Sequence, residues 1–218
     1  MSESWTKGSI EGQRFPSTLH KEKFEGRSFQ NYKEDLGLRA EEIECKDILD
    51  LGSGPTGRLE RELKDKAFVV SLSPDYRDNE YRGWLKKNKG KVRHAVAGLG
   101  QELPFKEESF DTICIYHVFE HVPEEAVEKI VEESIRVSRI GGHVHIMPVA
   151  PDEKLKTQLE LLAKKLGVKI LFEKTDATDS RWQDFSYVQK YSVTLERAIL
   201  EKVAKRRKQK TAPLGAVF

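Results

Sequence analysis

The sequence predicts an α/β fold in which a mostly parallel sheet ends in an antiparallel pair of strands. An apolar run, Ile48 to Leu51, leads directly into a glycine-rich turn and then into a helical pattern. Short β-branched segments continue to alternate with amphipathic helical segments, which is typical of parallel sheets. Near the end, 168–172 and 185–195 alternate apolar and polar residues with no helical pattern between them. These two strands are therefore expected to be antiparallel neighbours.

The other elements follow from apolar periodicity. Further strands, each short and apolar, are predicted at 67–72, 92–97, 110–116 and 143–149. Helices, each with apolar residues three and four positions apart, are predicted at 59–65, 123–140 and 155–166. Pro123 suits a first helical position, and Gly141-Gly142 and Gly167 are expected to end the second and third of these helices.

Composition limits the class of protein. With 218 residues the chain can form one α/β domain with a sizeable core. Charged residues make up 34% of the sequence but the formal net charge is only +2, so no global field would attract nucleic acid. Cys114 lies in a strand pattern and is expected to be a buried thiol. No apolar stretch has transmembrane length and no signal-peptide core is present, so we expect a soluble, cytoplasmic protein without membrane contact.

The turn after the first strand has the composition of a nucleotide-binding loop. Gly52 and Gly54 permit positive φ and a close approach of a ligand to the backbone. The helix that follows would offer its N-terminus to the ligand. The loop lacks the Gly-Lys-Ser/Thr ending of a P-loop. Asp50 beside the loop would repel a phosphate but attract an ammonium group.

Two blocks of sequence together indicate a family. Asp50-Leu-Gly-Ser-Gly-Pro-Thr-Gly57 resembles the first motif of class I S-adenosylmethionine-dependent methyltransferases. Leu103 to Asp111, running on to Val122, is similar to the fourth-strand region of the small-molecule branch of that family. The resemblance covers roughly residues 45 to 195. It implies a Rossmann-like three-layer sandwich, S-adenosylmethionine as cofactor and a small molecule as methyl acceptor.

The resemblance also implies a division of the chain. Residues 1–44 would form an N-terminal appendage or lid, 45–195 the methyltransferase domain, and 196–218 a basic helical tail. Tyr32 and Phe29 of the appendage are candidates to touch the ligand, although aromatic packing is the favoured role for them.

The resemblance implies that the first motif contacts the methionine end of the cofactor. By resemblance, Asp50, Gly52, Ser53 and Gly54 would surround that end. Gly57 would let the following helix pack closely.

The family's two other acidic positions are altered. At the end of the second strand, Ser71, followed by Leu72, stands where the family has an acid for the ribose. Leu99 stands where an acid meets adenine, and backbone groups of Gly100 and Gln101 would have to meet the base instead. Each lost charged hydrogen bond is worth roughly 1.5–3 kcal/mol, so weakened cofactor binding is expected.

Tyr116 and His117, at the exit of the fourth strand, lie where the resemblance places the acceptor against the methyl donor, and Tyr116 is expected to contact the cofactor. His117 is the candidate general base because its ordinary pKa is near neutrality. The alternative is that His117 only lines the pocket or caps the helix of Glu120.

Histidine pairs raise the question of a metal. His117 and His121 match an inverted zinc-protease pattern, but Pro123 begins a new helix directly afterwards. His143 and His145 share one strand face, where histidines paired within the sheet are the commoner case. No metal site is predicted.

Two rival functions remain open. Ser71 and Leu99 are compatible with a non-catalytic binding or regulatory protein that retains the fold. The basic residues of 202–210, with a second basic cluster at 82–93, are compatible with an RNA-directed methyltransferase. The Asn/Asp-Pro-Pro-Tyr/Phe signature is missing at 116–119, which disfavours methylation of adenine N6 or glutamine. The sequence leaves the acceptor and the oligomeric state open.

Overall fold

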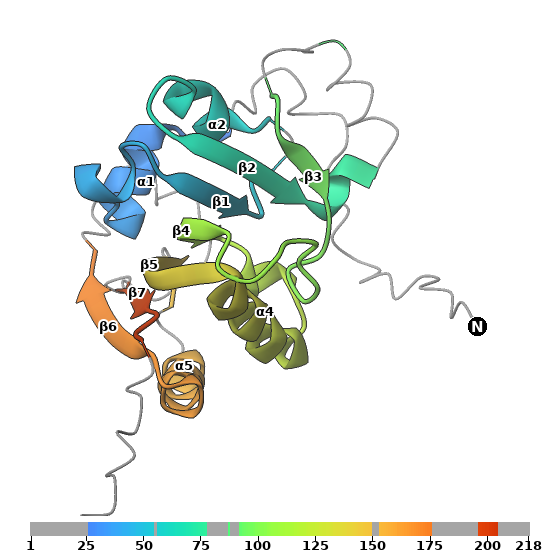
Figure 1. The fold of residues 1–218 in the computed structure, drawn as a ribbon. Coiled ribbons are helices and arrows are strands. Elements are labelled where there is room, and N and C mark those ends of the chain that lie inside the picture. The colour runs from blue at the N-terminus through green and yellow to red at the C-terminus, as the bar shows by residue number, and fades with distance from the viewer. Residues whose placement is uncertain are drawn as a thin grey trace, which may run out of the picture.

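The computed structural model describes residues 26–54, 56–77, 87, 92–149, 153–175 and 196–204 of the chain. The strands of the described part are β1 (Asp47–Leu51), β2 (Phe68–Ser73), β3 (Ala95–Ala97), β4 (Phe110–Tyr116), β5 (Ser138–Met147), β6 (Lys169–Lys174) and β7 (Glu196–Glu201). They form one seven-stranded sheet in the order β3-β2-β1-β4-β5-β7-β6 (Figure 1). β1 to β5 pair in parallel, and β7 is antiparallel to both β5 and β6. The predicted fold class is confirmed.

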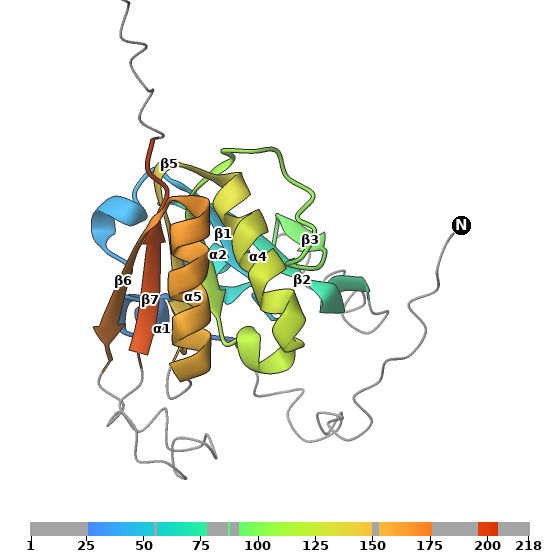
Figure 2. The same cartoon turned by 90° about the horizontal axis from the view of Figure 1, so that it is seen from below.

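Helices cover both faces of the sheet. The described helices are α1 (Phe29–Leu36), α2 (Arg58–Leu63), α4 (Glu124–Val137) and α5 (Glu153–Leu166). Short 3-10 helices are η1 (Ala40–Glu42), η2 (Pro74–Arg77) and η3 (Phe119–His121). α1 and α2 lie on one side and α4 and α5 on the other, which gives three layers (Figures 1 and 2). None of the described helices combines the length and apolar character that crossing a bilayer requires.

The two sides of the sheet have separate apolar cores because side chains alternate along each strand. Ile48 of β1 packs toward α1 and α2, whereas Leu49 packs toward α4 and α5. On β4, Cys114 belongs to the first cluster and Ile113 to the second. The prediction that Cys114 is buried is confirmed.

The predicted end of the second long helix is wrong. α4 ends at Val137, and β5 begins at Ser138 and continues through Gly141 and Gly142. The register between β4 and β5 shifts in this stretch. A Cβ on Gly142 would lie 2.7 Å from the carbonyl oxygen of Asp111. Gly142 therefore permits a close, irregular approach of two strands, and neither glycine caps the helix, whose C-cap is Ser138.

The predicted helical character of the tail at 196–218 is also wrong where it can be checked. Residues 196–201 form β7, between β5 and β6, with Ala198 and Leu200 fully buried. Pairing with β5 and β6 and the burial of Ala198 and Leu200 outweigh the helix propensity of this charged segment. The sheet thus extends past residue 195, and the strand predicted at 185–195 lies outside the described residues.

The N-terminal appendage is part of the domain where it is described. Tyr32 and Leu36 of α1, with Leu38 and Ile43 around η1, are buried in the core on that face of the sheet. Residues 1–25 of the predicted appendage lie outside the described part.

Candidate active site at the carboxyl ends of β1 and β4

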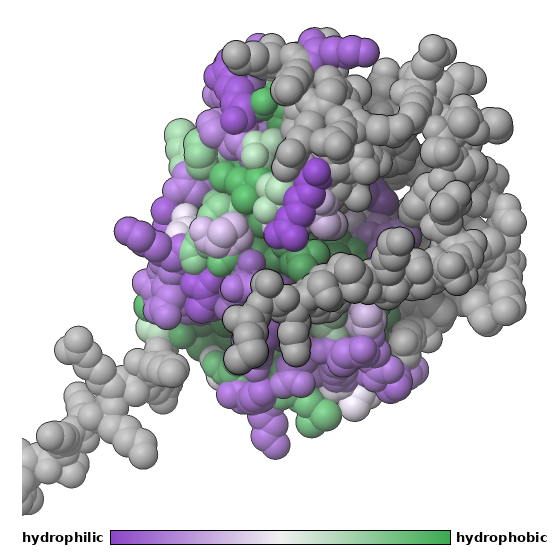
Figure 3. Space-filling view, turned by 90° about the vertical axis from the view of Figure 1, so that its right-hand side faces the viewer, coloured by the Kyte–Doolittle hydropathy of each residue, from purple (hydrophilic) through white to green (hydrophobic). Residues whose placement is uncertain are grey.

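The strand order creates a switch point between β1 and β4. From β1 the chain continues to β2 on one side, while β4 is followed by β5 on the other. Ligands of open α/β sheets bind where the order reverses, outside the carboxyl ends of the strands. Figure 3 looks onto the molecule from the side toward which β2 points, and apolar surface gathers in the middle of that face among hydrophilic residues.

The glycine loop after β1 has the backbone conformation that its sequence predicts. The φ angles of Gly52, Gly54 and Gly57 are 78°, 65° and 51°. The Gly52 N–H donates to the Leu72 carbonyl over 2.8 Å. A Cβ on Gly52 would overlap Cγ2 of Val118, from the turn after β4. Only glycine fits here, on grounds of both torsion and space.

Tyr76 of η2 holds the other side of the loop. Its hydroxyl donates to the Gly54 carbonyl over 2.8 Å and lies 3.0 Å from Ser53 Oγ. Sequence reasoning did not single out this residue. The available signal was its place in the short segment directly after the second strand.

Asp50 is the buried charge of the site. Its side chain is 1% exposed. Oδ1 accepts a hydrogen bond of 2.8 Å from the Tyr32 hydroxyl, whereas Oδ2 has no hydrogen-bond partner among the described residues. Burial raises the pKa of Asp50 to about 7. A buried acceptor without a donor costs free energy, so this oxygen favours a ligand that brings a donor.

The segment leading into α1 covers these groups. The Tyr32 ring meets the Tyr116 ring edge-on at 5.2 Å. The Tyr116 hydroxyl donates to Asp35, and the Arg27 guanidinium lies 4.4 Å from the centroid of the Tyr116 ring. Tyr32 therefore lies in the candidate site, while Phe29 packs against the neighbouring apolar cluster. Arg27 and Asp35 were not predicted, because no local pattern distinguishes them from other charged residues.

Replacing Tyr32 by phenylalanine should destabilise the protein more at pH 8 than at pH 5. The variant removes the only donor described for Asp50, and that loss matters most when the carboxylate is ionised. We expect a cost of about 1–3 kcal/mol at pH 8 and a smaller one at pH 5, measured by urea unfolding.

Tyr76→Phe is the matched control for this variant. It also removes a buried hydroxyl, but the partners Gly54 and Ser53 do not titrate in this range. Its cost should be the same at both pH values. Equal pH dependence in the two variants would contradict the assignment of Tyr32 to Asp50.

His117 follows β4 in a left-handed conformation, with φ of 55°. Its N–H donates to the Met147 carbonyl over 2.7 Å, and its ring Nδ1 lies 2.6 Å from Glu120 Oε1. Burial lowers the pKa of His117, although the hydrogen bond to Glu120 acts in the opposite direction. A neutral ring that donates from Nδ1 to a carboxylate carries its lone pair on Nε2. The predicted alternative, a cap on the helix of Glu120, is not what the structure shows: the N-cap of η3 is Val118, without a side-chain hydrogen bond, and His117 contacts the Glu120 side chain instead.

The two altered acidic positions differ in their surroundings. Ser71 is fully buried, and a Cβ on Gly57 would lie 3.2 Å from its Oγ, so this side chain faces the loop. Leu99 is 38% exposed. Gly100 packs so closely that a Cβ would lie 3.3 Å from Leu51, at the end of β1.

The remaining two predicted positions differ in exposure. Leu72 is buried beneath the loop and supplies the carbonyl that Gly52 contacts, and Gln101 is half-buried.

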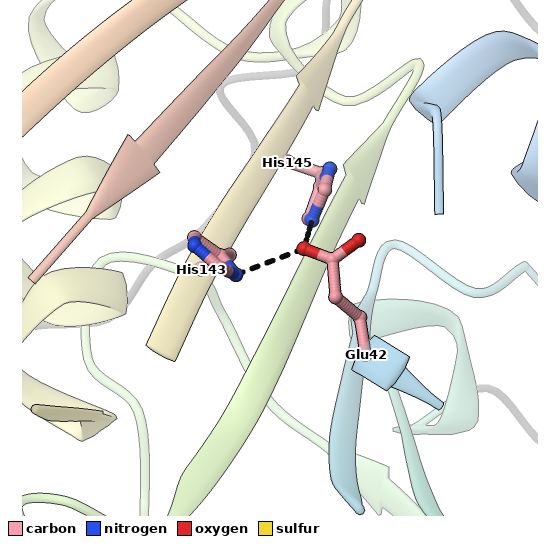
Figure 4. A group of neighbouring side chains, drawn as sticks. All are labelled: Glu42, His143 and His145. Carbon is pink, nitrogen blue, oxygen red and sulfur yellow. Dashed lines mark hydrogen bonds and ion pairs between the residues drawn. The ribbon is translucent and has the colours of Figure 1, made fainter. Parts of the chain in front are cut away.

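The histidine pairs behave differently from each other. His121 is exposed on η3, and the pattern it forms with His117 does not lie on one continuous helix. His143 and His145 instead converge on Glu42 of η1, as Figure 4 shows. Sequence reasoning noted the two histidines but not Glu42, which is far away along the chain.

Comparison with known proteins indicates which family the chain resembles. Residues 49–146 match the family described as "Methyltransferase domain", a span that contains the glycine loop, β4 and most of β5. A demethylmenaquinone methyltransferase of Streptomyces griseus is 35% identical over 103 residues, or 45% of this chain. The chain spans only 40% of the length of that relative.

Two solved structures share the fold. A methyltransferase of Methanosarcina mazei has a TM-score of 0.54 and 14% identity, covering 74% of this chain and 94% of its own. A 1,6-didemethyltoxoflavin-N1-methyltransferase of Burkholderia thailandensis, solved with 1,6-didemethyltoxoflavin and S-adenosylhomocysteine, has a TM-score of 0.53 and 14% identity, covering 74% and 72% of the two chains.

Proposed function

We propose that the chain, which matches a methyltransferase domain over residues 49–146, is a class I S-adenosylmethionine-dependent methyltransferase and that it transfers a methyl group to a small-molecule acceptor. The names of the Streptomyces relative and of the Burkholderia neighbour both denote small-molecule acceptors. S-adenosylmethionine supplies an electrophilic methyl group on a sulfonium, and S-adenosylhomocysteine is the product.

The observation that supports the proposal is a glycine loop beside a buried carboxyl group of which only one oxygen accepts a described hydrogen bond. Gly52 and Gly54 hold the loop at the switch point in left-handed conformations, and Gly52 packs so closely on Val118 that no side chain fits there. Asp50 Oδ2 is buried without a described donor. The methionine end of the cofactor carries an ammonium group, which would supply that donor and favour the ionised carboxylate. The residues present therefore fit this cofactor.

His117 is the group we assign to proton removal. It lies at the exit of β4, and its neighbour Tyr116 stacks on it at 5.1 Å between centroids. Nε2 would take the proton from the nucleophilic atom of the acceptor. Glu120 accepts the hydrogen bond from Nδ1–H and so fixes the orientation of the ring. Burial lowers the pKa of His117, which favours the neutral ring that a base requires.

Calorimetric titration with S-adenosylmethionine and with S-adenosylhomocysteine tests the proposal directly. We expect one molecule of either ligand to bind per chain. A folded sample that gives no heat at millimolar ligand would overturn it. Binding that appears only after Ser71→Asp and Leu99→Asp would instead indicate a non-catalytic binding protein.

Replacing His117 by alanine should lower kcat by about 10²–10⁴-fold while leaving the affinity for S-adenosylhomocysteine within a few-fold. Because the pKa of His117 is lowered, the base stays deprotonated below the ordinary range of histidine. The acidic limb of the wild-type kcat profile should lie correspondingly low. Glu120→Gln should shift that limb without abolishing activity. An unchanged kcat in His117→Ala would reassign the base.

The described part of the basic tail does not favour RNA. Lys202 Nζ donates to the Ser138 carbonyl over 2.8 Å and pairs with Glu108 at 3.5 Å, so its charge is used within the protein. Residues 205–210 of the tail lie outside the described residues. The small-molecule acceptor is therefore the function we put forward.

A further inference from the structure

A second group of ionisable side chains lies away from the glycine loop. Glu42 projects from η1, and His143 and His145 occupy alternate positions of β5, so that all three point toward one another (Figure 4). Glu42 Oε1 is 2.8 Å from His143 Nδ1 and 3.1 Å from His145 Nε2. Glu42 and His145 are 5% and 1% exposed, whereas the His143 side chain is 22% exposed. The cluster is thus buried on one side and reachable from solvent on the other.

The hydrogen bonds of His145 fix its protonation pattern. Nδ1 lies 3.0 Å from the Leu36 carbonyl oxygen, which can only accept. Nδ1 must therefore carry a hydrogen. In the neutral ring Nε2 then carries a lone pair, and that lone pair faces Glu42 Oε1. Two acceptors at this distance repel each other unless a cation lies between them: either an extra proton or a metal ion.

We propose that Glu42, His143 and His145 form a binding site for a divalent transition-metal ion of the zinc type. Two imidazole nitrogens and one carboxylate oxygen are a ligand set that suits zinc, cobalt and their neighbours. The three ligand atoms lie within 4.8 Å of one another. Ligand atoms around tetrahedral zinc are about 3.3 Å apart, given metal–ligand distances of about 2.0–2.1 Å. Small side-chain movements therefore suffice.

Contacts outside the triad resemble the outer shell of a metal site. Metal-bound histidines usually donate their second N–H to a carbonyl or carboxylate, which orients the ring. His145 does this with Leu36. The Arg39 backbone N–H donates to Glu42 Oε2 over 2.9 Å, which leaves Oε1 to face the histidines. Because the His143 side chain is 22% exposed, a fourth ligand would come from solvent.

The ion would act as a structural tie. It would join η1, and through Leu36 the end of α1, to the middle of the sheet. α1 carries Tyr32 and Asp35, which contact Asp50 and Tyr116 in the candidate active site. Binding of the ion should therefore stabilise the segment that covers that site, without taking part in the transfer.

Cobalt(II) is the probe for the test, because a tetrahedral site gives it visible absorption. The untagged full-length protein is freed of metal with a chelator and titrated with Co²⁺. We expect one ion per chain, displacement by Zn²⁺, and a rise in Tm when zinc is added. Glu42→Gln and His143→Asn should weaken binding by roughly 100-fold or more, since changes in the outer shell alone cost 10–100-fold.

His121→Ala is the matched control, because it removes an exposed histidine outside the triad and should leave binding unchanged. His143 is partly exposed, so His143→Asn is expected to fold, and circular dichroism checks this. Absence of one-to-one absorption in the wild type would overturn the proposal. So would binding that His143→Asn leaves intact or that His121→Ala removes. Each of these three results would leave the triad as a buried ion pair without a metal ion.

Discussion

Replacing Gly52 by alanine is expected to abolish measurable binding of S-adenosylhomocysteine, a loss of at least about 100-fold, and to destabilise the protein. The new methyl group would overlap Val118 Cγ2, and alanine is strained at the φ of 78° that this position adopts. Relief requires the loop or the turn after β4 to move. Because the glycine loop and the turn after β4 both border the switch point, either movement would change the shape of the cofactor site. Calorimetry and urea unfolding measure the two effects.

Gly141→Ala separates strain from overlap. Gly141 has the same φ of 78°, but a Cβ there would meet nothing within 4 Å. This variant should lose only the strain term, roughly 1–2 kcal/mol, and keep full ligand affinity. Adding Val118→Ala to Gly52→Ala should restore part of the stability by removing the overlap. Equal losses in the two single variants would show that Val118 plays no part.

Asp50→Asn is expected to remove a loss of folding stability that the wild type suffers as the pH rises. Burial raises the pKa of Asp50 from 3.8 to about 7. The unfolded chain therefore releases this proton at lower pH than the folded protein does. The contribution of Asp50 to stability is greatest below pH 4 and is lost as the pH rises to about 7. Asparagine does not titrate, so the stability of the variant relative to wild type should rise across this window by up to about 4 kcal/mol, at about 1.4 kcal/mol per pKa unit. Urea unfolding at pH 4, 5.5 and 8 measures it.

The same carboxylate should make cofactor affinity pH-dependent. If Asp50 receives the ligand ammonium, the ionised form binds, and wild-type affinity for S-adenosylhomocysteine should fall up to about tenfold per pH unit below 7. Asp50→Asn should bind weakly at every pH.

Asp111→Asn serves as the control. Asp111 is a partly exposed carboxylate paired with Arg139 at 2.5 Å, at the opposite end of β4, and its loss should leave the pH profile unchanged. Wild-type binding that is independent of pH would place the ammonium elsewhere.

Local sequence patterns predicted the elements whose ends are set locally. α5 ends at Leu166 as expected, because Gly167 adopts a left-handed conformation behind it. The loop after β1 was predicted for the same reason. The Gly141-Gly142 pair predicted a helix end that is not there, because a glycine that ends a helix and a glycine that lets two strands approach look alike in sequence.

The site was predictable only where one motif carries it. Asp50 and the glycines are adjacent in sequence, so the motif reveals them together. Tyr76, Arg27 and Asp35 reach the site through the tertiary fold, and their short contexts are ordinary. Glu42 joins two histidines that lie 101 and 103 residues further along the chain, which no spacing rule could reveal.

The position of β7 has a consequence for how the molecule is made. β6 pairs only with β7 among the described strands, and β7 also completes the edge of β5. When residues up to 175 have emerged from the ribosome, β6 therefore has no partner strand and the edge of β5 is unpaired. Until residue 201 emerges, the nascent chain exposes two unpaired strand edges to other proteins in the cell.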